Sequence, residues 1–362
     1  MTNKFLPVLL SFVLVLGCRE DQPDNPLVDI PYQPTPANLE IPDGFPRMSI
    51  PADNPLTVEG LDLGRRLFFD PIISADYSMS CASCHLPEGS FTDNFAVSKG
   101  IDGIEGRRSA MSLLNIGFAD QGLFWDGRSP TLEDQALLPV EDSIELHNTW
   151  TEVVDRLQAD ALYPELFRKA FGIERKEQIT KELAAKAMAQ FERSLISSGN
   201  SRYDRYTRGE IDFTDEELLG YELFFDFNTD ITDAQCGHCH NAPLFTTNQY
   251  LNNGIESVSS IQDFPDKGRG EVSADPFDNG RFRVPTLRNI EFSAPYMHDG
   301  RFQTLEEVVD HYNSGGHFQE NKDPLIQPLH LLDYEKEALL AFIRTLSDTT
   351  FIQNPSFQDP FK

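Results

Sequence analysis

Two Cys-x-x-Cys-His pentapeptides are the residues most able to carry chemistry in this chain. The first contains Cys81, Cys84 and His85, and the second contains Cys236, Cys239 and His240. In such a motif the two thiols form thioethers with the vinyl groups of haem, and the histidine donates a nitrogen to the iron. Zinc ribbons place their CxxC units about 15–20 residues apart, whereas these begin at positions 81 and 236. The spacing therefore predicts two covalently bound haem c groups.

Each pentapeptide follows a similar segment, which indicates an internal duplication. The segment Leu63–Asp70 reads LGRRLFFD, and Leu219–Asp226 reads LGYELFFD. A repeat this long does not belong to a solenoid, whose units have about 20–50 residues. The chain is therefore expected to contain two copies of one haem-binding domain.

The elements that must position these motifs read as helices joined by long loops. Thr214 to Glu217 and Thr304 to Glu307 have the spacing of capping boxes before apolar runs. Apolar residues keep helical spacing over 179–195 and 339–346, and long alternating strand patterns are missing. We expect an all-α fold of two cytochrome c-like domains related by duplication, with long loops.

The N-terminus predicts export and a lipid anchor. Residues 1–18 contain Lys4 and an apolar run of a length typical of a secretory signal. The segment Val15–Cys18 resembles a bacterial lipobox, so Cys18 is the expected lipidation site; a plain signal peptide or a buried helix is the alternative. Haem attachment of this kind occurs outside the cytoplasm. The expected location is the periplasm or cell envelope, with membrane contact only through the lipid anchor.

The domain limits follow from these observations. We expect a lipoprotein signal at 1–18, a tether rich in proline and acidic residues at 19–55, an N-terminal cytochrome c-like domain at 56–200 and a C-terminal cytochrome c-like domain at 201–330. Residues 331–362 are expected to form a helix and tail that pack back on the N-terminal domain.

Charge and cysteine content restrict the partners. The 362 residues include 58 acidic and 30 basic side chains, for a net charge of −28, which excludes a nucleic-acid-binding surface. A redox partner is expected to dock through a basic face. The five cysteines divide into one for lipid and four for haem, leaving none for disulfides.

Further motifs lie around the two pentapeptides. They are Phe124–Arg128 (FWDGR), Leu132–Ala136 (LEDQA), Pro139, Glu145, Val284–Asn289 (VPTLRN) and Ala294–Gly300 (APYMHDG). Over roughly residues 55 to 350 the chain resembles the bacterial dihaem cytochrome c peroxidases and their MauG-like relatives. The resemblance implies an oxidoreductase that reduces hydrogen peroxide to water at the N-terminal haem. The C-terminal haem would relay or store the oxidising equivalents.

The same resemblance implies roles for three residues. Glu145 matches the catalytic acid–base, Gln135 matches the polar residue beside it, and Trp125 matches the tryptophan between the haems. Elementary chemistry agrees for Glu145, because peroxide must lose one proton to bind iron and regain one on its far oxygen.

The chain departs from ordinary family members at both irons. Those members cap the resting peroxidatic iron with a histidine after the first pentapeptide, but residues 86–146 contain none, and His147 follows the expected catalytic glutamate. We predict an N-terminal iron that is five-coordinate or water-bound. At the C-terminal iron, Tyr312 stands where the family has methionine and where MauG has tyrosine. Ligation by Met297 or His311 is the alternative, and His298 is a candidate second-sphere group.

The resemblance also implies a calcium ion and partner proteins. The calcium position matches Ser109, Ser293 and Pro295, although Ser109 replaces the usual asparagine. Electrons would come from a small cytochrome c or cupredoxin, or from a side chain of a protein substrate as in MauG. A homodimer is an option from the family. A dihaem cytochrome that only transfers electrons is the other class considered, and Glu145, Gln135 and the absent capping histidine speak against it.

Overall fold

The computed structural model describes residues 26–227 and 233–362, so Cys18 and the predicted signal segment lie outside the described residues. The α-helices are α1 (Val58–Phe69), α2 (Leu132–Glu141), α3 (Trp150–Ala159), α4 (Tyr163–Phe171), α5 (Lys181–Ser194), α6 (Arg202–Thr207), α7 (Asp215–Phe225), α8 (Cys236–Cys239), α9 (Gly270–Ser273), α10 (Leu305–Ser314), α11 (Asp333–Arg344) and α12 (Thr349–Ile352). A two-stranded antiparallel sheet pairs β1 (Tyr250–Leu251) with β2 (Phe282–Arg283). The expected all-α architecture is confirmed.

Short 3-10 segments interrupt the loops between these helices. They are η1 (Pro26–Asp29), η2 (Pro71–Ile73), η3 (Cys81–Ser83), η4 (Pro87–Gly89), η5 (Ile116–Phe118), η6 (Lys176–Gln178), η7 (Pro276–Asp278), η8 (Ile290–Phe292) and η9 (Pro355–Phe357). No helix in the described ranges is both long enough and apolar enough to cross a membrane.

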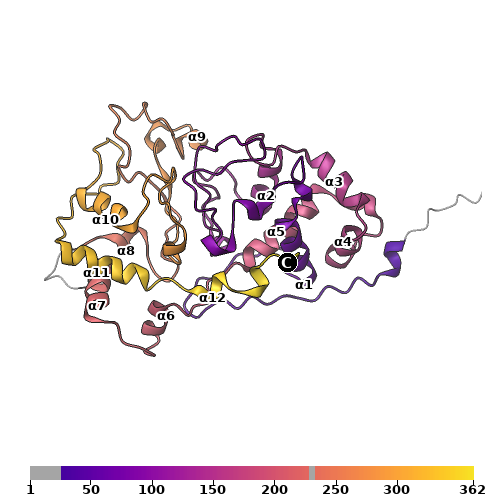
Figure 1. The fold of residues 1–362 in the computed structure, drawn as a ribbon, viewed down its shortest axis with the longest axis horizontal. Coiled ribbons are helices and arrows are strands. Elements are labelled where there is room, and N and C mark those ends of the chain that lie inside the picture. The colour runs from indigo at the N-terminus through magenta and orange to yellow at the C-terminus, as the bar shows by residue number, and fades with distance from the viewer. Residues whose placement is uncertain (1–25, 228–232) are drawn as a thin grey trace, which may run out of the picture.

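The first half is built on the crossing of α1 and α5, which lie side by side in Figure 1. Thr57 and Thr180 cap the two helices through their side chains, each contributing about 1 kcal/mol. The helices meet at Gly64, where a Cβ atom would overlap the carbonyl oxygen of Ala187 and contact Phe191. Glycine at this position therefore lets two helix backbones touch.

The second half repeats this crossing with α7 and α11. The expected capping boxes at Thr214 and Thr304 are present, and the first of them begins α7. A Cβ atom at Gly220 would overlap the carbonyl oxygen of Ala338 and contact Phe342. The two crossings use the same residue types at the same spacing, which supports the duplication inferred from the sequence.

The C-terminal segment divides between the two halves. Helix α11, which was expected to pack back on the first domain, instead lies against α7 in the second (Figure 1). The tail beyond it does reach the first half: Phe351 packs against Phe91, and the Arg65 side chain donates to the Gln358 carbonyl at 2.9 Å. The reason is that the apolar face of α11 buries Leu339 and Phe342 in the second core.

A buried ion-pair cluster joins the halves. The Arg108 guanidinium, whose side chain is 9% exposed, donates to both Asp266 oxygens at 2.7 Å and to Asp126 at 2.5 Å. Burial is the largest single influence on Asp266 and opposes its ionisation, but the hydrogen bonds from Arg108 and the Gly268 amide, together with the charge of Arg108, outweigh burial and hold the pKa of Asp266 below its usual value. Arg108 thereby ties a loop of the first half to a loop of the second.

Candidate haem and peroxide site

The histidines of both pentapeptides are held in the same way. The Nδ1 of His85 lies 2.8 Å from the Phe91 carbonyl oxygen, and the Nδ1 of His240 lies 3.1 Å from that of Phe245. Phe91 and Phe245 both have positive φ, 63° and 54°, which turns each carbonyl back toward its histidine. A ring that donates from Nδ1 leaves the Nε2 lone pair free for a metal. Both histidines thus have the geometry of proximal iron ligands.

Burial keeps both imidazoles neutral. It lowers the pKa of His85, and it lowers the pKa of His240 to about 4. A neutral imidazole is the form that binds iron. The four cysteines are free of disulfides, as the haem assignment requires. Cys81 begins η3 and Cys84 directly follows it, while Cys236 and Cys239 are the two ends of the short helix α8.

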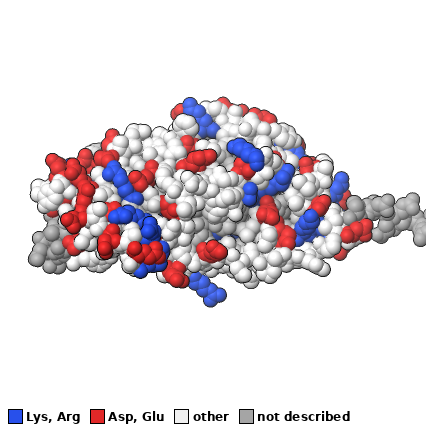
Figure 2. All heavy atoms as spheres, turned by 60° about the horizontal axis from the view of Figure 1, so that its bottom comes forward, with Lys and Arg blue, Asp and Glu red and all other residues white. Residues whose placement is uncertain are grey.

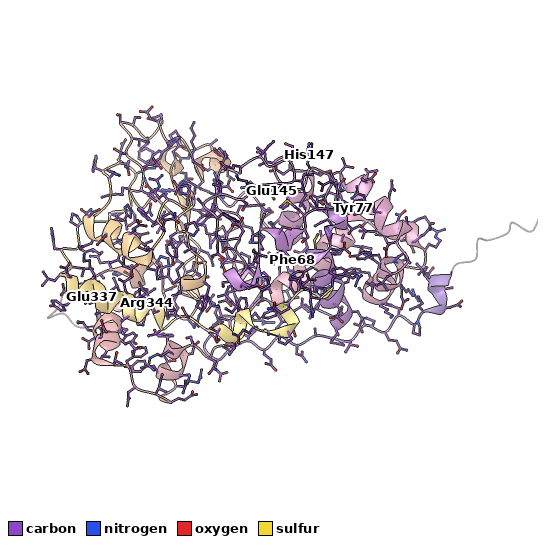
Figure 3. All side chains as sticks on the ribbon, viewed as in Figure 1. Phe68, Tyr77, Glu145, His147, Glu337 and Arg344 are labelled. Atoms are coloured by element: carbon purple, nitrogen blue, oxygen red, sulfur yellow. The ribbon has the colours of Figure 1, made fainter. Side chains whose placement is uncertain are left out.

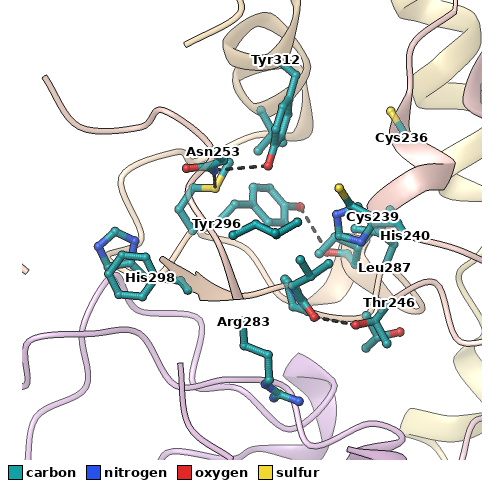
Figure 4. A pocket seen from close by; sticks show the side chains of 18 of the residues that line it. Cys236, Cys239, His240, Thr246, Asn253, Arg283, Leu287, Tyr296, His298 and Tyr312 are labelled. Atoms are coloured by element: carbon teal, nitrogen blue, oxygen red, sulfur yellow. Dashed lines mark hydrogen bonds between the residues drawn. The ribbon is translucent and has the colours of Figure 1, made fainter. Parts of the chain in front are cut away.

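A largely apolar cavity opens beside the second pentapeptide (Figure 4). It is lined by Cys236, Cys239, His240, Leu305, Val309, Tyr312, Leu339 and Ile343, among others. Figure 4 shows the Tyr312 hydroxyl pointing into the cavity, next to Asn253. Burial raises the pKa of Tyr312 to about 12. A phenol in this place would be deprotonated only by a strong local charge such as ferric iron.

The two candidate distal ligands of this cavity share one neighbour. The Asn253 amide donates to the Tyr312 oxygen at 3.3 Å and lies 3.5 Å from the Met297 sulfur. His311 instead directs its Nε2 to the Asn253 carbonyl oxygen, at 3.0 Å. Tyr312 and Met297 therefore both line the cavity, and the choice between them stays a prediction.

Arg283 supplies a test of whether the cavity suits a haem. This arginine lines the cavity and is 6% exposed, and among the described residues its guanidinium contacts only the Asn248 oxygen and the Met111 sulfur. Its Nε has no partner, and burial lowers its pKa to about 10. A buried cation of this kind needs an anion. The two propionates of haem are such anions, so the residues fit the group.

Trp125 lies at the junction of the two halves. Its indole Nε1 donates to the Ser109 carbonyl at 2.9 Å, and its own carbonyl accepts from the Arg283 amide of β2 at 2.8 Å. The Ser109 amide in turn donates to the His298 carbonyl at 2.8 Å. Trp125 also lines the cavity. Its expected place between the two haems stays a prediction.

Glu145 follows α2 in the first half and is half-buried (Figure 3). Burial and then the nearby Asp142 carboxylate raise the pKa of Glu145 to about 7, although Arg128 opposes the shift. Glu145 also perturbs the Cys81 and Cys84 thiols electrostatically, so it lies near the first haem-binding motif. A carboxyl group with this pKa can both accept and return a proton near neutral pH. Gln135 lies half-buried on α2.

Two observations bear on the open iron site predicted for the first half. His147 is at the surface with its side chain 53% exposed, and its Nδ1 lies 2.5 Å from Asp102. Helices α2 and α10 both begin after a threonine cap, and Pro139 stands eight residues after Thr131 as Tyr312 stands eight after Thr304. Proline has no group that can bind iron. The structure thus offers no histidine or tyrosine at the first-half counterpart of Tyr312.

The residues expected for calcium come together but make other contacts. The Ser109 hydroxyl donates to the Met297 carbonyl at 3.0 Å, and the Ser293 hydroxyl donates to the Ile290 carbonyl at 3.1 Å. Ser109, Ser293 and Pro295 all line the cavity. No group of three or more acidic, histidine or cysteine side chains in the described ranges could hold a metal ion. Calcium stays a prediction, and nothing below depends on it.

Sequence reasoning missed three contributors to this site. Arg283 directly precedes the VPTLRN motif. It is recognised as part of the site only in the structure, where it is buried and no carboxylate pairs with it. Asn253 lies in no motif and is found only by its contact with Tyr312. Arg128, inside the FWDGR motif, lowers the pKa of Glu145 and lies over the Phe124 ring at 3.5 Å. The positive charge of Arg128, inside a motif already singled out, could have indicated this role from the sequence.

The fold and this site define a mostly helical protein with one c-type haem-attachment motif in each half. A family model described as di-haem cytochrome c peroxidase matches residues 58–212. The cytochrome-c peroxidase IdrP1 of Pseudomonas sp. (strain SCT) is 32% identical over 330 residues, covering 84% of each chain. The chain belongs to the di-haem cytochrome c peroxidase family. It is accordingly an oxidoreductase, and the family implies two haem c cofactors.

Similarity extends to the MauG branch and to solved structures. The methylamine utilization protein MauG of Methylorubrum extorquens is 34% identical over 312 residues, covering 86% of this chain and 83% of that protein. A crystal structure of a MauG-like protein associated with microbial copper homeostasis matches with a TM-score of 0.82 and 35% identity, covering 90% of this chain and all of that one. The expected cytochrome-like fold is confirmed.

Proposed function

We propose that this protein reduces hydrogen peroxide to water at the N-terminal haem, while the C-terminal haem relays or stores oxidising equivalents. The observation that carries the proposal is Glu145, a half-buried carboxyl group near the first pentapeptide whose pKa is about 7. A protein that only transfers electrons has no need for an acid–base group there.

The protein's own residues have distinct tasks in this reaction. When bound, haem iron supplies the site that binds peroxide and exchanges electrons with it. The ionised Glu145 carboxylate accepts the proton that peroxide gives up on binding, and the neutral acid returns it to the departing oxygen. Gln135 on the preceding helix is proposed to orient peroxide by hydrogen bonding.

Electron movement between the halves is proposed to pass through Trp125. Its indole is held by the Ser109 carbonyl, and its backbone is joined to Arg283 of β2. These two bonds hold the residue where a loop of the first half meets a strand of the second. A rigid aromatic group at that position loses little energy to reorganisation when it gives up an electron.

The test is stopped-flow mixing of the oxidised dihaem protein with hydrogen peroxide. A rapid change of the Soret band, without prior reduction, is the expected result because the first iron lacks a histidine cap. An unchanged Soret band would mean that the protein does not react with peroxide in this state and would overturn the proposal.

A second candidate function is peroxide-dependent oxidation of a side chain in a partner protein. It is favoured by Tyr312, whose buried hydroxyl faces the second haem cavity. An anionic oxygen ligand lowers the iron potential and favours high oxidation states, whereas methionine raises it. The spectrum of the resting ferric protein should change in Tyr312→Phe and stay unchanged in Met297→Leu. The reverse result would assign methionine and favour ordinary peroxidase turnover.

The proposed surroundings follow from charge and from the N-terminus. Acidic side chains gather over the end of the molecule that carries α7, α10 and α11 (Figure 2). A small cytochrome c or cupredoxin with a basic face would be steered to such a surface. We place the protein in the periplasm or cell envelope, anchored by lipid at Cys18, with a homodimer as an option. Labelling with a radioactive fatty acid, lost in Cys18→Ala, tests the anchor.

A further inference from the structure

Glu192 is a buried carboxyl group for which the peroxide reaction has no use. It lies near the end of α5, is 5% exposed, and its Oε2 has no hydrogen-bond partner among the described residues. A buried acid without a partner is costly to ionise. A stable protein can keep such a group if the group stays neutral, or if a nearby charge compensates it in one state of the protein.

The internal duplication shows which way this position faces. Gly64 meets Ala187 and Phe191 on α5, and Gly220 meets Ala338 and Phe342 on α11. Position 192 on α5 therefore corresponds to position 343 on α11. Ile343 lines the cavity beside Cys236, Cys239 and His240. If the two halves are equivalent, Glu192 faces the haem position of the first half, as Ile343 faces that of the second. The second half thus has an apolar side chain where the first has a carboxyl group.

Electrostatics agree with this placement. After burial, Glu192 is the largest influence on the pKa of the Cys81 thiol and raises it. Cys81 is the first haem-attachment residue, so the carboxyl group lies close to the haem edge. It lies on α5, whereas Glu145 lies in the segment that follows α2.

The charged groups around Glu192 leave it uncompensated. Arg193, its neighbour on α5, donates to both oxygens of Glu133 on α2 at 2.7 and 2.8 Å and is thus already paired. Burial raises the pKa of Glu192 to about 8; Arg193 lowers it and Glu133 raises it. The Cys81 thiol on η3, whose pKa Glu192 raises, would become a thioether once haem is attached.

We propose that Glu192 is the redox-linked proton site of the N-terminal haem. The carboxyl group binds one proton when the iron is reduced from ferric to ferrous, and it releases that proton when the iron is oxidised. In the reduction, one electron from a donor protein or mediator and one proton from solvent enter together, so the added negative charge is neutralised within the protein. The proposal rests on haem occupancy of the first pentapeptide and not on peroxide turnover.

The test is an equilibrium redox titration of the dihaem protein at several pH values around 8, with the two irons followed separately by electron paramagnetic resonance. Because the ferrous state holds the proton more tightly, the equilibrium constant for reducing the N-terminal iron should fall as pH rises. The limit is tenfold per pH unit, which is 59 mV for a one-electron couple. Glu192→Gln, which is neutral at every pH, should remove this dependence.

Two matched substitutions separate Glu192 from other acids. Glu145→Gln removes the distal carboxyl group, and Glu335→Gln removes a buried carboxyl group of α11 in the other half. Both should keep the pH dependence. A flat wild-type potential, a dependence that survives in Glu192→Gln, or one that disappears only in Glu145→Gln would each overturn the proposal.

A measurement on the unmodified protein covers the case in which Glu192→Gln does not assemble. Reduction near pH 8 should add an infrared band of a protonated carboxylic acid, with uptake of up to one proton per N-terminal iron. Proton uptake of zero would contradict the proposal. Neither experiment uses peroxide, so an inert Soret band on peroxide mixing would refute the proposed function and leave this inference standing.

Discussion

At the residue scale, Glu145 and Glu192 are two carboxyl groups whose pKa values are raised by burial but whose positions suit them to different roles. Both pKa values are raised, to about 7 and about 8, and burial is the main cause in each case. Glu145 lies near the first haem motif in a loop after α2 and is half-buried. Glu192 lies on α5, inside the core. The first is suited to proton transfer with substrate, and the second to compensating charge.

The role of Glu145 predicts a pH dependence. The carboxylate is the base that accepts the proton of peroxide, and its raised pKa means that this form is populated only above pH about 7. The second-order rate constant for the Soret change should therefore rise as pH increases through 7. Glu145→Gln should lower the rate constant about 10²–10⁴-fold and remove the pH dependence.

Glu141→Gln is the control, because Glu141 is an exposed residue at the end of α2, the helix that precedes Glu145. It should react as the wild type does. A Glu145→Gln protein that keeps both the rate and its rise with pH would show that another group moves the proton.

At the element scale, the crossings of α1 with α5 and α7 with α11 hold the two haem motifs. In each, glycine permits backbone contact. Replacing glycine by alanine inside an exposed helix stabilises it by about 0.5–1 kcal/mol. Here the added methyl group would overlap a carbonyl oxygen, so the substitution is expected to destabilise the fold instead of stabilising it.

Gly64→Ala and Gly220→Ala are expected to lower the free energy of unfolding by about 1–3 kcal/mol each. Denaturant unfolding of the dihaem protein, followed by circular dichroism, measures the change. Gly106→Ala is the control, since a Cβ there would make only ordinary contacts and the backbone has no positive φ. Equal stability of all three variants would mean that the helices separate freely at the crossings.

At the scale of the whole molecule, Arg108 links the halves through Asp126 and Asp266. Removing one partner of a buried ion pair leaves uncompensated charge and costs about 3–5 kcal/mol. Arg108→Met should therefore lower the unfolding midpoint strongly. Arg107→Met is the control: this neighbour pairs with Glu271 at 2.9 Å, but its side chain is 59% exposed, so a loss of about 0–1 kcal/mol is expected.

The same pair predicts behaviour in acid. The folded pKa of Asp266 lies below its ordinary value of 3.8, so its contribution to stability is complete above that value and is lost as pH falls through the folded pKa. Without Arg108, burial still raises the pKa of Asp266, and only the Gly268 amide and the charge of His298 remain to lower it, so this loss moves to higher pH. Unfolding midpoints of wild type and Arg108→Met at pH 3–6 check this. Parallel curves would contradict the assigned pairing.

The sequence by itself determined the features whose partners are adjacent in the chain. Both haem-attachment pentapeptides, the capping boxes at Thr214 and Thr304 and the helical periods of α5 and α11 are local, so neighbouring residues suffice to specify them. The resemblance to the family was also readable, because its motifs are short and contiguous.

Only the tertiary structure decided the features that depend on burial and on distant partners. These include the packing of α11 on α7, the junction of Trp125 with Arg283, and the orientation of Glu192 toward the first haem position. The physical reason is that a helix period identifies an apolar face without identifying the surface that covers it. A carboxyl group likewise acquires a raised pKa only when chain segments far apart in sequence exclude water from it.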